Sequence, residues 1–391
     1  MVIERDISSE ITPYLDSPEA IVITGMRRTG KTTLLRSLYE RTDSHNKLFI
    51  DLENPLQRRY FEEEDYERVK QHFELLGINL TERAFVFLDE IQFVKNGPSV
   101  VKYLGDHYRT KFFLTGSSSY YLKNLFSESL VGRKYIFELF PFNFREFLRF
   151  KGEPLVVPDI AAGNTVSETV FKTFERHYDE YLTFGGFPGV VAKADVKEKK
   201  RALDDIFSSY YQLEVIQLGD FRKTDVIRNL MALLLGRVGS KLDMQKLASE
   251  LSISRPTLYE YLSFLSGTYF VSTIKPFSKS RDVEVRGAEK VYACDSGLVN
   301  HVAQVDIGAL FEQNVFQLLR PRGTVHYYQR RGGSEVDFIL NRSEAYEVKH
   351  HASLQDVKRL ERISKSLGLT RQQVISKQYV NHPGTGYAFL L

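Results

Sequence analysis

The segment that decides the fold reads Gly25-Met26-Arg27-Arg28-Thr29-Gly30-Lys31-Thr32 and matches the phosphate-binding pattern G-x-x-x-x-G-K-[ST] at every fixed position. An apolar run at 20–24 comes directly before it, and a helix-forming run at 33–39 comes directly after it. A strand, a glycine-containing loop and a helix in this order are the context in which the pattern forms a phosphate site. The flanking runs therefore favour a nucleotide site over the alternative, a glycine-rich turn that binds nothing.

The residue types in the loop suit the binding of an anion. Two glycines allow backbone N–H groups to curl around a phosphate, and the helix that follows adds the positive end of its dipole. Lys31 is expected to reach the β- and γ-phosphates, and the Thr32 hydroxyl to ligate Mg²⁺. We therefore predict ATP and Mg²⁺ as cofactors, with the nucleotide bound by Gly25, Met26, Arg27, Arg28, Thr29, Gly30, Lys31, Thr32 and Thr33.

A second motif follows further along the chain, where an apolar run at 85–88 ends in Asp89 and Glu90. Asp89 is placed to hold Mg²⁺, and Glu90 is placed to orient the water that attacks the γ-phosphate. Ser117 ends the next apolar run and is a candidate sensor of the γ-phosphate or of that water. A simple serine-rich turn remains the alternative for Ser117.

The composition is that of a cytoplasmic protein. The chain has 391 residues, a formal net charge of +3 and a single cysteine, Cys294. One cysteine excludes an internal disulfide and a Cys-rich zinc site, which fits a reducing compartment. The first residues do not have a secretory pattern, and no apolar run has the length of a membrane span, so we expect no membrane contact. The small net charge does not indicate nucleic acid by itself.

Residues 1–140 predict a parallel sheet covered by helices on both faces, because short apolar runs alternate with helical patterns. The expected strands are 20–24, 47–52, 84–89, 111–115 and 135–139. Residues 141–238 are helical and charged, and we interpret them as a helical lid.

Residues 239–287 predict a winged helix-turn-helix. One short helix is expected at 244–251, and Ser254 can cap the second helix. Strand-like runs at 271–274 and 290–293 are expected to form the wing.

Such modules place their second helix on DNA. The residues expected to contact phosphates are Arg255, Lys275, Lys279 and Arg281. The alternative is a winged helix that only packs between domains, because the second helix carries Glu260 and few donors suited to base edges.

Residues 288–391 predict a compact α+β unit. Its expected order is a helix, three strands, a helix and two strands, at 308–319, 324–329, 335–340, 344–349, 354–367, 373–376 and 387–391. Glu347 and Lys349 are two apart in a strand and share a face, and a hairpin around 341–343 brings Asp337 to that face. Two carboxylates and a lysine so arranged can bind Mg²⁺ and activate a water, although acidic-x-Lys strands also occur on ordinary solvated sheets.

The motifs resemble those of prokaryotic AAA+ ATPases known as archaeal/bacterial ATPases, whose C-terminal half has long been a domain of unknown function. The likeness runs over nearly the whole chain and includes the loop, Asp89-Glu90 and the segments 115–118, 130–133, 141–148, 185–189 and 291–298. It implies a P-loop AAA+ fold and hydrolysis of ATP. It also implies that Arg133 is an arginine finger for a neighbouring subunit. Such a role would require a homo-oligomer, whereas an Arg133 acting within its own chain would allow a monomer. A structural Arg133 paired with a local carboxylate is the alternative.

The C-terminal unit resembles the PD-(D/E)xK, or restriction-endonuclease-like, nuclease core. The resemblance implies catalytic roles for Asp337, Glu347 and Lys349, a metal site of Asp337, Glu347 and Glu312, and phosphate contacts from Gln329 and Arg331. The sequence departs from the pattern because no proline precedes Asp337. Such domains can also keep the fold as a DNA-binding platform without cleaving.

The sequence thus predicts an α/β protein with four parts: a P-loop AAA+ ATPase core (1–140), a helical lid (141–238), a winged helix (239–287) and a nuclease-like domain (288–391). ATP hydrolysis by Lys31, Glu90 and Arg133 would be coupled to DNA binding or processing. One alternative is a nucleotide-switched DNA-binding or regulatory protein whose nuclease-like domain is inactive. Another is a switch that acts on a protein partner without DNA.

Overall fold

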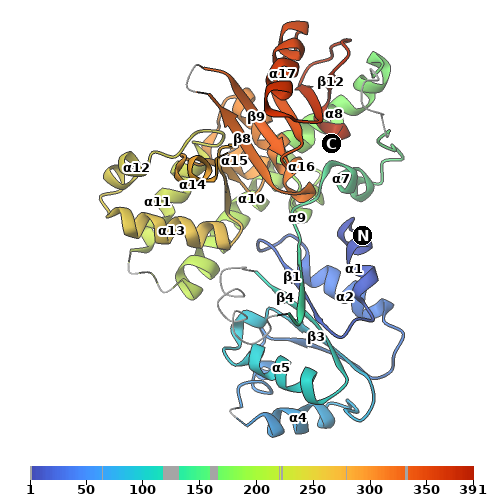
Figure 1. Cartoon of the computed structure of the whole chain (residues 1–391). Helices are drawn as coiled ribbons and strands as arrows, with labels where there is room; N and C mark the ends of the chain where they lie inside the picture. The colour runs from blue at the N-terminus through green and yellow to red at the C-terminus, as the bar shows by residue number, and fades with distance from the viewer. Residues whose placement is uncertain are drawn as a thin grey trace. The chain divides into compact units, whose positions relative to one another are not determined.

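A computed structural model describes the chain except for residues 1, 64, 118–131, 159–165, 220, 222, 279 and 331–332, and except for the side chains of 281 and 283. The described residues form two compact units (Figure 1). The first comprises Met1–Phe140 with Gly267–Tyr269, and the second comprises Pro141–Ser266 with Phe270–Leu391. The finer division into four domains stays a prediction.

The first unit contains a five-stranded parallel sheet, as the sequence predicts. Its strands are β1 (Ala20–Thr24), β2 (Lys47–Asp51), β3 (Ala84–Asp89), β4 (Thr110–Gly116) and β5 (Lys134–Glu138). The strand order is β2-β3-β4-β1-β5, so β4 separates β1 from β3. Because all the strands are parallel, their carboxyl ends lie at one edge of the sheet.

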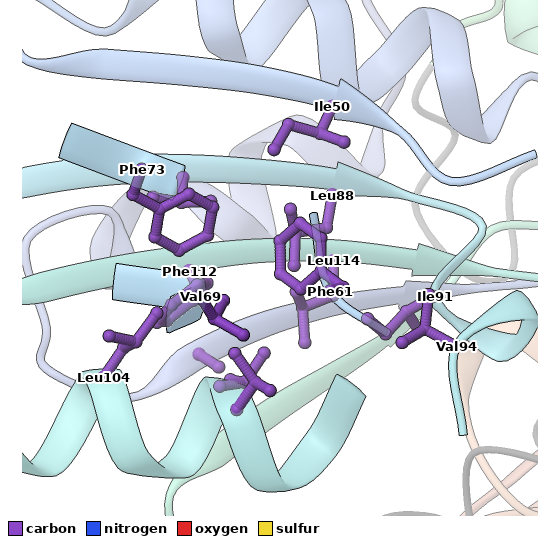
Figure 2. Packing of buried hydrophobic residues seen from close by; sticks show 14 of the residues in the cluster. Ile50, Phe61, Val69, Phe73, Leu88, Ile91, Val94, Leu104, Phe112 and Leu114 are labelled. Carbon is purple, nitrogen blue, oxygen red and sulfur yellow. The ribbon is translucent and has the colours of Figure 1, made fainter. Parts of the chain in front are cut away.

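Helices cover both faces of this sheet (Figure 1). The helices of the unit are α1 (Ile7–Ile11), η1 (Thr12–Tyr14), α2 (Lys31–Arg41), α3 (Pro55–Arg58), α4 (Tyr66–Leu75), η2 (Ile91–Phe93) and α5 (Gly97–His107). Figure 2 shows Phe73 of α4 and Leu104 of α5 packed against Phe112 and neighbouring strand residues. On the other face, Leu35 of α2 packs with Phe113 of β4. Adjacent strand residues face opposite sides, so a strand buried on both faces reads as a continuous apolar run.

The second unit begins with helices. They are α7 (Phe144–Lys151), α8 (Glu168–Phe184), α9 (Pro188–Val191), α10 (Val196–Tyr210), the π-helix η3 (Tyr211–Leu218) and α11 (Thr224–Leu235). Two further helices, α12 (Met244–Glu250) and α13 (Arg255–Gly267), precede an antiparallel pair of β6 (Val271–Ile274) and β7 (Lys290–Ala293). Between the two strands lies α14 (Arg281–Arg286), and after them lies α15 (Ser296–Ala303). The Ser254 hydroxyl accepts a hydrogen bond from the Thr257 N–H, as expected for the cap of α13.

A mixed sheet forms the rest of the second unit. Its elements are α16 (Ile307–Leu319), η4 (Arg320–Arg322), β8 (Val325–Gln329), β9 (Glu335–Leu340), β10 (Glu344–Lys349), α17 (Leu354–Leu367), β11 (Arg371–Ser376) and β12 (Thr385–Gly386). The order is β12-β11-β10-β9-β8, antiparallel from β8 to β10 and parallel from β10 to β12. In β9, Phe338 packs near Phe316 of α16, whereas Ile339 packs in the cluster that contains Leu360 of α17. The two helices therefore cover opposite faces.

The prediction of a strand at 387–391 is wrong. The chain pairs with β11 only at Thr385 and Gly386, and Ala388–Leu390 forms a short 3₁₀ helix, η5. Aromatic packing takes these residues away from the sheet, because the Phe389 ring stacks on Phe174 and on Tyr387. The described helices include none that is long and apolar enough to cross a membrane.

The buried side chain of Asp295 accepts hydrogen bonds from several elements of the second unit. It caps α15 by accepting hydrogen bonds from the N–H groups of Gly297 and Leu298, and it also accepts from the Gly186 N–H at 2.8 Å and from the Gln317 amide at 3.1 Å. Burial raises the pKa of Asp295 to about 6, so the carboxylate is ionised at neutral pH and depends on these donors. The contacts join the turn before α9 to α15 and α16.

We expect Asp295→Ala to destabilise the second unit by about 3 kcal/mol, because it leaves several buried donors without an acceptor. Asp306 is the matched control, since it caps α16 in the same way but is exposed. Asp306→Ala should cost only about 1 kcal/mol. Urea unfolding followed by circular dichroism measures both, and equal losses would show that the buried contacts of Asp295 contribute nothing.

Candidate functional site

The phosphate-binding pattern forms the connection between β1 and α2. Gly30 is the residue before α2 and has a left-handed backbone with φ 98°. Gly25 has φ 150°, and a Cβ atom at this position would lie 2.1 Å from the Leu139 carbonyl oxygen. Both positions therefore require glycine, one for backbone conformation and one also for the close approach of the segment that follows β5.

Lys31 lies inside the loop and is only 3% exposed. Its Nζ donates to the carbonyl oxygens of Gly25 at 3.0 Å and Met26 at 3.2 Å, and it is 3.8 Å from Oε1 of Glu90. The structure thus brings together the lysine and the glutamate that the sequence predicts to be catalytic. Arg27, in the same loop, forms an exposed ion pair with Glu53.

Arg5, which lies outside the phosphate-binding loop in sequence, donates a hydrogen bond to it. The sequence did not predict this role. The Arg5 guanidinium donates to the Thr29 carbonyl at 2.9 Å and to the Phe140 carbonyl at 2.7 Å. The loop is therefore tied to the last residue of the first segment of this unit. A single arginine near the start of a chain has no local pattern that would reveal this role.

Asp89 and Glu90 lie at the carboxyl end of β3, and Thr115 of β4 joins them. The Thr115 hydroxyl donates to Asp89 and accepts from the Glu90 N–H at 2.9 Å. Burial raises the pKa of Asp89 above its usual value, and the hydrogen bonds from Thr115 and Thr32 partly offset this effect. The predicted Mg²⁺ ligands, Thr32 and Asp89, are thus close enough for the Thr32 hydroxyl to lower the pKa of Asp89.

Glu90 has a left-handed backbone with φ 55°, which is uncommon for a residue other than glycine and is typical of strained functional sites. The Gln92 side-chain amide donates to the Glu90 carboxylate and, at 3.0 Å, to the hydroxyl of the fully buried Ser117. Ser117 therefore reaches Glu90 through Gln92. The sequence contains no periodic signal for Gln92, whose role appears only in the fold.

Arg133 lies at the opposite edge of the sheet from this site. It precedes β5, its carbonyl accepts from the Ala20 N–H at the start of β1, and its Nε is 3.1 Å from Oδ1 of Asp106. Arg133 thus lies at the amino ends of the strands, whereas Lys31 and Glu90 of the same chain lie at the carboxyl ends. Residues 118 and 130–131, which belong to the resembling segments, lie outside the described residues.

The carboxylates of the second unit have separate partners. Asp337 in β9 accepts from the Val348 N–H at 2.7 Å. Glu347 in β10 is 3% exposed and is bound by Lys349 at 2.7 Å and by Arg359 of α17. Burial and the Asp337 charge raise the pKa of Glu347 above its usual value.

Glu312, on α16, accepts from the Tyr292 hydroxyl at 2.7 Å and lies 3.5 Å from Nζ of Lys290. Burial, together with the Asp337 carboxylate, raises its pKa to about 7. Within the described ranges, no group of three or more His, Cys, Asp or Glu residues is arranged to hold a metal ion. The charge of Asp337 acts on both Glu347 and Glu312, although each carboxylate is bound to a different donor of the chain. The metal site of Asp337, Glu347 and Glu312 stays a prediction.

The predicted DNA contacts are described only in part. Arg255 is exposed at the start of α13, and Lys275 is half exposed and lies 3.9 Å from Glu289. The side-chain amide oxygen of Gln329 accepts a hydrogen bond from Nζ of Lys241. Residues 279 and 331 and the side chain of Arg281 lie outside the described set.

Comparison with known proteins matches two segments of the chain to known domain families. Residues 17–148 match the AAA domain, and residues 175–307 match a domain of unknown function, DUF8612. An uncharacterized protein of Methanocaldococcus jannaschii is 28% identical over 94% of this chain and 83% of its own length. One from Haemophilus influenzae is 24% identical over 88% and 85%. The Aeropyrum pernix ORC1 protein, solved in complex with DNA, aligns with 12% identity and a TM-score of 0.32 over 77% of this chain and 93% of that one.

The chain therefore contains an AAA-type ATPase domain at residues 17–148. The loop, Lys31, Asp89 and Glu90 all fall within it. The curated relatives are themselves uncharacterized, and the match to DUF8612 covers α9 to α15 without describing an activity.

Thr115→Val should reduce ATP hydrolysis by about 10–100-fold, because it removes the hydroxyl that holds Asp89 and Glu90 in place. Thr110→Val is the matched control: Thr110 is buried at the other end of β4, and its hydroxyl has no hydrogen-bond partner among the described residues. The steady-state kcat of both variants tests this role. If the two variants lose activity equally, the bridge formed by Thr115 is not important.

Proposed function

We propose that this protein binds and hydrolyses ATP and couples its nucleotide state to DNA binding or processing through α12–α13 and the C-terminal sheet. The observation that carries the proposal is the contact network at the carboxyl ends of β1 and β3. There Lys31 approaches Glu90, and Thr32 approaches Asp89.

The residues at this edge suit hydrolysis of the γ-phosphate. Thr32 and Asp89 offer neighbouring oxygen ligands and would hold Mg²⁺, which neutralises charge on the phosphates. When ATP binds, the Lys31 ammonium would leave the loop carbonyls and Glu90 and bind the β- and γ-phosphates instead. Glu90 would then be free to accept a proton from the attacking water, with Gln92 and Ser117 fixing its orientation.

Arg133 acts, in this proposal, on a neighbouring copy of the chain. Its position before β5 separates it from the Lys31 of its own chain, which leaves the nucleotide of another subunit as the target of an arginine finger. The ion pair with Asp106 would hold Arg133 until a neighbour approaches. A homo-oligomer follows from this assignment.

The coupling to DNA rests on the second unit. The helices α12 and α13 followed by the β6–β7 pair have the order of a winged helix, with Arg255 exposed at the start of the second helix. The order from α16 to β11 is that of the nuclease core which the sequence resembles. A specific observation favours the second candidate, a DNA-binding unit without cleavage: Glu347 and Glu312 are bound by basic side chains of the chain itself.

Lys31→Ala is expected to lower the ATPase kcat/KM by about 100-fold or more, because the loop loses its charge toward the phosphates. Lys70→Ala on α4, a half-buried lysine away from the loop, should leave the rate unchanged. Because the proposal couples nucleotide state to DNA, addition of DNA should change the rate of ATP hydrolysis by the wild type. Calorimetry that detects no uptake of Mg²⁺–ATP by folded wild-type protein would overturn the proposal.

Arg255→Glu combined with Lys275→Glu should weaken DNA binding and reduce its dependence on salt, because about two phosphate contacts are lost. Lys172→Glu, at an exposed lysine of α8, reverses a charge of the same unit outside the proposed interface. Fluorescence anisotropy over a range of salt concentrations measures the affinity. Equal effects of the double variant and of Lys172→Glu would remove α13 from the interface.

A further inference from the structure

Lys290 lies at the centre of a charged group in the second unit that the ATPase site does not use. It belongs to β7 and is 5% exposed. Its Nζ is 2.8 Å from Oε1 of Glu335 in β9 and 3.5 Å from Oε1 of Glu312 in α16. The ammonium also lies over the ring of Tyr327 in β8, 5.5 Å from the ring centroid. Four elements of the fold therefore meet at one buried cation.

The carboxylates around Lys290 are held on more than one side. The Tyr292 hydroxyl donates to Glu312 at 2.7 Å, and a Cβ atom at Gly239 would lie 3.0 Å from the same carboxylate. Asp337, two residues after Glu335, accepts from the Val348 N–H at 2.7 Å. Glu312 and Asp337 are thus fixed by donors of the chain, and Lys290 supplies the positive charge between α16 and β9.

Lys290 and a divalent cation would compete for the Glu312 carboxylate. A metal ion bound by Glu312 and Asp337 would bring a second positive charge beside the ammonium of Lys290. The lysine would then be left buried beside like charge, and breaking a buried ion pair is strongly destabilising. Because the buried ammonium of Lys290 is already paired with Glu312 and Glu335, it opposes metal binding there by charge as well as by position.

We infer that Lys290 takes the place of a divalent cation among Glu312, Glu335 and Asp337, so that this site is a permanent internal ion-pair group and does not perform metal-dependent cleavage of phosphodiesters. The inference goes beyond the proposed ATPase function. Its test needs neither ATP nor DNA, so a failure here leaves the ATPase proposal standing.

The experiment compares melting temperatures of the full chain with and without Mn²⁺, in the absence of nucleotide. The P-loop is the same in every protein compared, so any contribution it makes to Mn²⁺ binding is common to all. Lys290→Met should lower the melting temperature by about 5–15 °C, because Glu312 and Glu335 lose their counter-charge, and Mn²⁺ should restore part of the loss. Wild type should show no Mn²⁺ effect beyond that of Glu312→Gln.

A double variant, Lys290→Met with Glu312→Gln, keeps the test decisive if the single variant fails to fold. Removal of both charges should return the melting temperature toward that of the wild type and abolish the response to Mn²⁺. Two results would overturn the inference. One is a rise in the wild-type melting temperature with Mn²⁺ that is lost in Glu312→Gln. The other is a Lys290→Met protein as stable as the wild type and indifferent to Mn²⁺.

Discussion

Pairing of buried charges is the constraint on which both functional regions of the structure depend. A charge removed from water must find an opposite charge or several hydrogen-bond donors, or its burial opposes folding. Lys31 satisfies this requirement with loop carbonyls and Glu90, and Asp295 satisfies it with backbone N–H groups. The same requirement has different outcomes: the partners of Lys31 are groups that a phosphate can replace, whereas Asp295 is enclosed by donors of the fold.

The fold of the first unit could be predicted from the sequence because its signals are local. Each central strand is a short apolar run between turn residues, and each predicted boundary lies within one residue of the observed strand. The loop after β1 and the carboxylates after β3 follow from the parallel arrangement, which places both at the same edge. The closeness of Lys31 and Glu90 could therefore be predicted from the sequence.

The remaining parts of the site could not be predicted because they depend on pairing between distant strands. Thr115 acts on Asp89 only because β4 lies between β1 and β3, an order that no local pattern encodes. Gln92 and Lys290 are single polar residues whose importance comes from what surrounds them. The residues after Gly386 have the apolar composition of a strand, but stacking of Phe389 on Phe174 takes precedence over sheet pairing.

The two hydrogen bonds that Arg5 donates to carbonyl groups limit how far the chain can be shortened at its amino end. One of these carbonyls belongs to the nucleotide loop, and the other belongs to Phe140, where the first unit gives way to the second. A truncation that begins after Arg5 removes both hydrogen bonds at once.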